Sequence, residues 1–207
     1  SLVGVRDPQG FRPLCLGKTE NGYVLSSESC AFDAIKAEFI RHIDPGEMVI
    51  IDDSGVRSTM YAEPEKIDKK LCVFEYIYFA RGDSHIDGQS VYQSRLNMGR
   101  ELYNETKYDA DIVMSIPDSG TTAALGYARA SGIPFAEGLV KNRYSGRTFI
   151  KPNQEERELA VRMKLNALPH IVGGKRIVLI DDSIVRGTTS GIIVKMLKEA
   201  GAKEIYM

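Results

Sequence analysis

One stretch decides the fold, and it reads Gly174-Lys-Arg-Ile-Val-Leu-Ile-Asp-Asp-Ser-Ile-Val-Arg-Gly-Thr-Thr-Ser190. Residues 177–180 are an unbroken apolar run rich in β-branched side chains, which predicts a strand buried on both faces of a parallel sheet. Apolar residues then recur at helical spacing over 192–200, and Gly201 is placed to end that helix. Strand, loop and helix therefore predict a site at the carboxyl end of a sheet strand, where open α/β sheets bind ligands.

The loop between this strand and this helix has the composition of a sugar-phosphate site. A helix start offers unpaired N–H groups and a positive dipole end, which hold a phosphate. Gly187 lets the backbone approach that phosphate, and the hydroxyls of residues 188–190 can donate to it. Asp181 and Asp182 would repel a phosphate but suit sugar hydroxyls or Mg²⁺. These features favour a ribose 5-phosphate ligand over the alternative, an acidic turn with an ordinary helix cap.

Composition excludes several classes of protein. The 207 residues carry 27 basic and 28 acidic side chains, and the formal charge of -1 gives no general attraction to nucleic acid or membranes. The sequence contains neither an apolar stretch long enough to span a membrane nor a signal segment at its start. Three cysteines indicate a reducing compartment. We expect a soluble cytoplasmic protein, and a start at Ser1 with a stop inside an apparent strand suggests a piece of a longer one.

The first 60 residues have the pattern of a mostly β region. Strands are expected at residues 2–5, 23–26, 48–51 and 56–61. One helix is expected at about 31–43, because Phe32, Ile35, Phe39 and Ile43 would share a face. Residues 61–70 are charged and contain a proline, which suits a linker, so a domain boundary is placed near Leu71.

The pattern after Leu71 alternates between helix and strand. The expected elements are a helix at 90–107, a strand at 111–116, a helix at 121–131 and a strand near 135–140. This alternation predicts a parallel sheet flanked by helices. A second loop, Ile116-Pro-Asp-Ser-Gly-Thr-Thr122, also follows a strand and opens a helix, so its N–H groups can face an anion. A helix cap by Ser119 or Thr121 is compatible with that role.

The charged segment 141–164 is a candidate lid. Lys141, Arg143 and Arg147 are suitable counter-charges for a pyrophosphate leaving group, and a closing loop would exclude water from a reactive sugar cation. The alternative is a solvated surface loop.

Residues 178–190 resemble the signature of the phosphoribosyltransferases that use 5-phosphoribosyl-1-pyrophosphate (PRPP). Residues 141–150 and 162–166 resemble the catalytic loop of one branch, the amidophosphoribosyltransferases, and residues 75–81 resemble the segment that joins their two domains. Further matches lie at 4–14, 27–33 and 45–47, in the later part of the family's N-terminal-nucleophile glutaminase domain. The resemblance covers essentially the whole chain.

The resemblance implies a fold of two classes, α+β and α/β. Residues 1–70 would be the later part of a glutaminase sandwich. Residues 71–207 would be a type I phosphoribosyltransferase domain, incomplete at its C-terminal end, with a parallel sheet flanked by helices. The implied reaction opens purine synthesis: ammonia from glutamine displaces pyrophosphate from PRPP and gives 5-phosphoribosylamine.

The resemblance also implies site residues. Asp181 and Asp182 would hold the ribose hydroxyls and Mg²⁺, and Ser119 would contribute to the magnesium site. Asp118 and Ser119 would bind the pyrophosphate of PRPP. The rest of the PRPP loop would comprise Ser183, Ile184, Val185, Arg186, Gly187, Thr188, Thr189 and Ser190. The catalytic lid residues would be Lys141, Arg147, Thr148 and Lys164.

Several features depart from the family's pattern or extend it. The family's glutaminase nucleophile is the N-terminal cysteine of the mature chain, whereas this sequence begins with Ser1, so this chain alone should not hydrolyse glutamine. Gly82 replaces a usual proline. Cys72 occupies the position of one ligand of the [4Fe–4S] cluster that some members carry, with a small buried thiol as the alternative. Cys15 and Cys30 are interpreted as ordinary interior cysteines.

The implied partners are PRPP, glutamine or ammonia, purine nucleotides as feedback inhibitors and further copies of the chain in a homo-oligomer, with no nucleic acid or membrane. Two alternatives keep the PRPP site, a PRPP-sensing regulator and a salvage phosphoribosyltransferase. A phosphoacceptor receiver domain also places an acidic residue after a strand, but it would not need the loop at 187–190.

Overall fold

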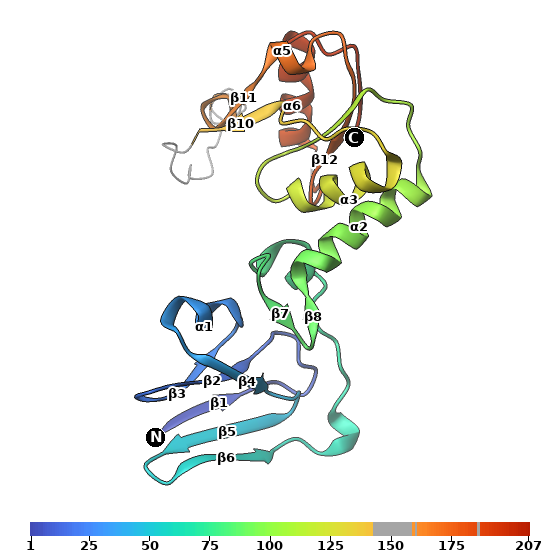
Figure 1. Ribbon diagram of the computed structural model, residues 1–207. Helices are drawn as coiled ribbons and strands as arrows, with labels where there is room; N and C mark the ends of the chain where they lie inside the picture. The colour runs from blue at the N-terminus through green and yellow to red at the C-terminus, as the bar shows by residue number, and fades with distance from the viewer. Residues whose placement is uncertain (143–158, 160, 186) are drawn as a thin grey trace. The chain divides into compact units, whose positions relative to one another are not determined.

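The computed structural model describes residues 1–142, 159, 161–185 and 187–207 (Figure 1). It forms two compact units, Ser1–Ser94 and Arg95–Met207. The boundary between these units lies inside one helix, α2 (Val91–Glu105). The assignment of residues 1–70 and 71–207 to two family domains stays a prediction. No helix in the described part of the chain has the length and apolar character needed to cross a bilayer.

The first unit contains two antiparallel three-stranded sheets. One has the order β1-β5-β6, formed by Leu2–Val5, Glu47–Asp52 and Gly55–Met60. The other has the order β3-β2-β4, formed by Gly22–Ser26, Cys15–Thr19 and Glu38–His42. Leu16 from one sheet and Val49 from the other meet in a single apolar core with Ile43. Two sheets that share a core agree with the expected sandwich.

The predicted helix over residues 31–43 is wrong. Helix α1 covers only Cys30–Ile35, because Lys36 takes the left-handed conformation (φ 55°) and ends it. The chain then enters β4, where Phe39 pairs with Gly17 of β2. Phe32 is buried and Ile35 is half exposed, so the helical spacing of apolar residues did not mark one face. Strand pairing with β2, which is not local in the sequence, overrode the helical pattern.

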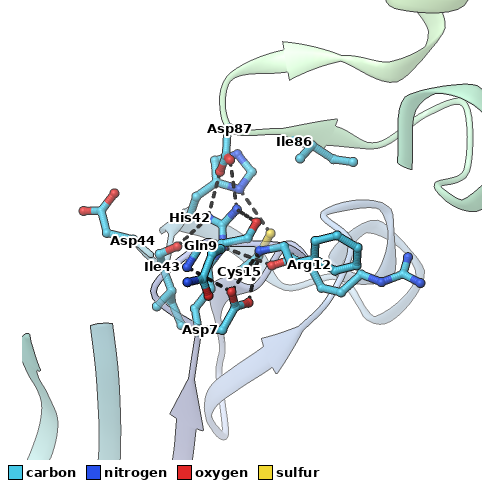
Figure 2. Close-up of polar contacts among 12 residues, drawn as sticks. Asp7, Gln9, Arg12, Cys15, His42, Ile43, Asp44, Ile86 and Asp87 are labelled. Atoms are coloured by element: carbon cyan, nitrogen blue, oxygen red, sulfur yellow. Dashed lines mark hydrogen bonds and ion pairs between the residues drawn. The ribbon is translucent and has the colours of Figure 1, made fainter. Parts of the chain in front are cut away.

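Residues 61–94 complete the first unit through short elements. These are η1 (Pro64–Lys66), the π-helix η2 (Glu75–Phe79), β7 (His85–Ile86), β8 (Gln89–Ser90) and the start of α2. A buried arginine, Arg6, ties this segment to the sheets. Its guanidinium donates to both carboxylate oxygens of Asp87, each at 2.9 Å, and to the carbonyl oxygen of Ile43 at 2.7 Å. Figure 2 shows Asp87 and Ile43 within this polar cluster.

The second unit is built on a parallel sheet of order β13-β12-β9, formed by Glu204–Tyr206, Arg176–Ile180 and Ile112–Ser115. Alternate strand residues face opposite layers. Met114 and Leu179 pack with Ile193 of α6 (Thr188–Glu199). Val113 and Val178 pack with Tyr127 of α3 (Thr121–Ser131). The predicted strand at 177–180 is therefore buried on both faces, and the expectation of a parallel sheet flanked by helices is confirmed.

A short antiparallel ribbon extends this unit. It pairs β10 (Leu139–Lys141) with β11 (Leu165–Ala167), and α5 (Pro169–Val172) follows. The predicted strand at 135–140 is thus wrong as a single element, since Phe135 makes only an isolated bridge to Val113 before β10 begins. The predicted helices at 90–107 and 121–131 are confirmed by α2 and α3.

Candidate functional site

The two predicted ligand loops lie side by side. Strands β9 and β12 are parallel neighbours, so their carboxyl ends meet at one edge of the sheet. The last contact of this ladder is the N–H of Ile116, which donates to the carbonyl oxygen of Ile180 at 2.9 Å. The 116–121 loop begins at Ile116, and the central loop begins at Asp181, directly after Ile180. The tertiary structure therefore brings together two loops that are 60 residues apart in the sequence.

The two carboxylates of the central loop have different surroundings. Asp181 is half-buried, and burial raises its pKa; its Oδ1 accepts the backbone N–H of Asp182 at 2.9 Å. The carboxylate of Asp182 accepts a hydrogen bond from the hydroxyl of Ser183 at 2.8 Å. An ionised carboxylate has about four lone-pair sites, so beyond these hydrogen bonds each group can accept hydrogen bonds from a diol or ligate a hard cation.

The loop beyond Asp182 opens helix α6. Gly187 occupies the N-cap position with φ 70°, a left-handed conformation that favours glycine, and open space surrounds it. No side chain caps this helix in the described residues, so the N–H groups of its first turn can bind a ligand. Ile184 and Val185 are exposed at the loop tip, and Arg186 lies outside the described residues.

The 116–121 loop opens helix α3 in the same way. The peptide between Pro117 and Asp118 is cis. The hydroxyls of Ser115 and Thr121 lie 3.1 Å apart across the base of the loop. Asp118 is exposed and forms an ion pair with the ammonium group of Lys141. Ser119 is half-buried beside it.

A cavity of about 490 Å³ lies against this loop. Its lining residues are Ser115, Pro117, Asp118, Thr121, Phe135, Glu137, Leu139, Val140, Lys141 and Asn142. Among the described residues of this lining, Lys141 is the cation, and Asp118 and Glu137 are carboxylates. Glu137 is not among the predicted site residues, because the segment after Phe135 reaches the cavity only through the fold of the second unit.

Two of the four predicted lid residues lie together. Lys141 pairs with Leu165 in the β10–β11 ribbon, and the N–H of the next residue, Asn142, donates to the carbonyl oxygen of Lys164 at 2.7 Å. Lys141 and Lys164 therefore stand at the same end of the ribbon. Arg147 and Thr148 lie outside the described residues.

The three cysteines are separate thiols. Cys15 and Cys30 are buried, as expected of interior cysteines, and burial raises the pKa of Cys15 to about 11. Cys72 is half-buried, and its N–H donates to the carbonyl oxygen of Phe11 at 3.1 Å. Over the described ranges, no group of three or more His, Cys, Asp or Glu side chains is arranged to hold a metal ion.

Relatives match the chain along its full length. An amidophosphoribosyltransferase of Archaeoglobus fulgidus is 55% identical over 207 residues, which is 100% of this chain and 45% of the relative. The Bacillus subtilis amidophosphoribosyltransferase is 52% identical over 206 residues, 100% of this chain and 43% of the relative. The chain is homologous to amidophosphoribosyltransferase throughout. It spans less than half the length of these curated relatives, and no protein-family model matches it.

Solved structures agree with this relationship. The glutamine PRPP amidotransferase from Bacillus subtilis, complexed with ADP and GMP, has a TM-score of 0.90 at 51% identity, covering 99% of this chain and 44% of that one. A structure described as the allosteric regulatory enzyme of purine biosynthesis also has a TM-score of 0.90 at 51% identity, covering 99% of this chain and 43% of that one. The amidophosphoribosyltransferase fold expected from the sequence is therefore confirmed for this chain.

Proposed function

We propose that this chain supplies the PRPP-binding site, and part of the glutaminase half, of an amidophosphoribosyltransferase. The reaction is displacement of pyrophosphate from C1 of PRPP by glutamine-derived ammonia, which gives 5-phosphoribosylamine. The observation that carries the proposal is the pair of adjacent loops at the carboxyl ends of β9 and β12, in a chain 55% identical to a named member of this class. A salvage enzyme or a PRPP-sensing regulator would not account for homology that includes residues 1–70.

The central loop would hold the ribose 5-phosphate half of the ligand. The open first turn of α6 and the hydroxyls of Thr188, Thr189 and Ser190 bind the 5-phosphate. Asp181 and Asp182 accept hydrogen bonds from the ribose hydroxyls. Their negative charge also favours the positive charge that develops at C1 as the bond to pyrophosphate breaks.

The 116–121 loop would hold the pyrophosphate. The N–H groups of Ile116, Gly120 and Thr121 donate within the fold, so the ammonium group of Lys141, which lines the cavity beside Asp118, would supply the main positive charge. Lys141 has to leave Asp118 for the phosphate oxygens, so binding exchanges one ion pair for another. Arg147, Thr148 and Lys164 remain proposed lid residues that close over the leaving group.

Mg²⁺ fits this site if the phosphates of the substrate supply part of its coordination. Mg²⁺ is usually bound by one or two carboxylates together with substrate phosphates, rather than by a complete protein cage. Asp181 and Asp182, with Ser119 on the neighbouring loop, match that donor set of hard oxygens. The ion would neutralise negative charge on the departing pyrophosphate.

Cys72 stays a proposed ligand of one [4Fe–4S] cluster, as the resemblance implies. Such a cluster needs four cysteine ligands, and Cys72 is one candidate, while Cys15 and Cys30 are buried elsewhere. No step of the proposed reaction is assigned to a cluster.

Purine nucleotides are proposed as feedback ligands. A nucleoside monophosphate carries the same ribose 5-phosphate as PRPP, so the central loop can bind it in competition. The nucleotide complex of the Bacillus subtilis relative supports this proposal. A homo-oligomer is also proposed.

The test is calorimetric titration of Mg²⁺ and PRPP into the chain and into an Asp181→Asn, Asp182→Asn double variant. The expected result is magnesium-dependent binding that the double variant loses. An Asp53→Asn, Asp68→Asn variant is the matched control, since it makes the same charge change at two exposed positions in the first unit. Binding that survives in the Asp181/Asp182 variant, or that is absent from the unmodified folded chain, would contradict the proposed site.

A further inference from the structure

The two ligand loops approach each other closely at Gly120. This residue is buried and occupies the N-cap position of α3. Its N–H donates to the carbonyl oxygen of Ile116 at 3.2 Å, and its own carbonyl accepts the N–H of Ala124 at 3.0 Å. Both hydrogen bonds hold Gly120 in place between the end of β9 and the first turn of α3.

Backbone conformation does not explain a glycine at this position. Gly120 has φ -75° and ψ -11°, values that every L-amino acid adopts without strain. In contrast, Gly187 of the central loop needs its positive φ of 70°. What distinguishes residue 120 is therefore the space around it.

A side chain at residue 120 would collide with the end of β12. An added Cβ would lie 2.5 Å from the carbonyl oxygen of Ile180 and 3.0 Å from the Cα atom of Asp181. Neither group can yield freely. The same carbonyl oxygen accepts the N–H of Ile116 at 2.9 Å, and Asp181 carries the first carboxylate of the site. A methyl group would have to push the 116–121 loop away from the carboxylate pair.

We propose that Gly120 is a positioning residue that sets the distance between the two loops, and thereby matches the site to one ligand that occupies both. The inference rests on the proposed function, since PRPP carries its pyrophosphate and its 5-phosphate on one ribose. Ligands that occupy a single loop do not depend on this distance. A ligand that bridges the loops does, because moving one loop draws its contacts away from a ligand that the other loop holds. In catalysis, a misplacement of about 1 Å lowers the reaction rate by on the order of 100-fold.

The test compares bridging and single-loop ligands by calorimetry on Gly120→Ala. The probes are ribose 5-phosphate, magnesium pyrophosphate and magnesium PRPP. The expected result is at least a tenfold increase in the Kd of PRPP, with the Kd values of the two smaller ligands within threefold of the unmodified chain. Gly173→Ala is the matched control, because it adds the same methyl group outside both ligand loops and also against a backbone carbonyl oxygen, that of Pro169 at 2.7 Å. It should leave all three Kd values unchanged.

An equal increase in the Kd values of all three ligands would show general structural damage and overturn the proposal. An unchanged Kd for PRPP would also overturn it.

A second measurement uses the unmodified chain and so does not depend on the variant folding. A PRPP analogue with one methylene inserted between C1 and the pyrophosphate should bind at least tenfold more weakly than PRPP, and equal binding would overturn the fixed spacing. If the unmodified chain binds the two smaller ligands but not PRPP, the proposed function fails along with this inference. If the unmodified chain binds PRPP but Gly120→Ala does not raise the Kd of PRPP selectively, this inference fails and the proposed function stands.

Discussion

The buried guanidinium of Arg6 allows a prediction of stability in the first unit. Its side chain is 2% exposed, and Asp87 supplies the carboxylate that balances its charge (Figure 2). Asp87→Asn removes that charge and keeps the size of the side chain. It also suits the left-handed backbone of residue 87, since asparagine tolerates φ 47°.

The expected loss is about 2–3 kcal/mol of unfolding free energy. Removing one partner of a buried ion pair costs about 3–5 kcal/mol, because the other charge stays buried without compensation. The side chain of Asp87 is 37% exposed, so water solvates part of the orphaned site and the loss lies at or below the lower end of that range. Arg6 also keeps its hydrogen bonds to the carbonyl oxygens of Gly10, Arg12 and Ile43.

The assay is hydrogen exchange measured by mass spectrometry on peptides from residues 1–94. A loss of 2–3 kcal/mol corresponds to exchange that is roughly 30- to 150-fold faster in the strands of this unit. Glu63→Gln is the control, because its partner Lys66 and Glu63 itself are 67% and 61% exposed, and such pairs contribute about 0–1 kcal/mol. Exchange in Asp87→Asn that matches the control would refute the reasoning.

Two further predictions concern charge. A bidentate hydrogen-bonded pair with Arg41 lowers the pKa of the buried Glu47 from 4.5 to about 2. Because this pKa is depressed on folding, the stabilisation is complete above pH 4.5 and is lost as the pH falls toward 2, a difference of roughly 3 kcal/mol. Acid unfolding followed by circular dichroism should show a shallower pH dependence in Glu47→Gln, and an unchanged slope would contradict this. Asp118→Asn should bind metal-free pyrophosphate up to about fivefold more tightly by calorimetry, because it frees Lys141 from an exposed ion pair worth at most ~1 kcal/mol. Weaker binding would count against the exchange of partners by Lys141.

The local sequence pattern was sufficient to predict strand β12, the central element of the second unit. A strand buried on both faces must be apolar at every position, and residues 177–180 satisfy this without reference to the rest of the chain. The positions of Asp181 and Asp182 follow from that strand. Gly187 is expected there because glycine lets the backbone approach a phosphate, and the structure adds that it takes a left-handed conformation before α6. The same reasoning located α3 and the 116–121 loop.

Other features depended on contacts between distant residues. The 31–43 segment has a helical pattern, yet its second half pairs with β2, and only the presence of that strand determines the outcome. The single strand expected at 135–140 is divided for a similar reason, since β10 takes β11 as its partner.

The sequence by itself determined where the two loops lie in the chain, because the order of strand, loop and helix fixes their positions; that their residues bind a sugar phosphate stays a prediction. The tertiary structure alone decided how the two loops meet. Parallel pairing of β9 with β12 places Ile116 against Ile180, and the missing side chain of Gly120 lets the loops approach. That distance depends on packing between segments 60 residues apart, so no local pattern in the chain encodes it.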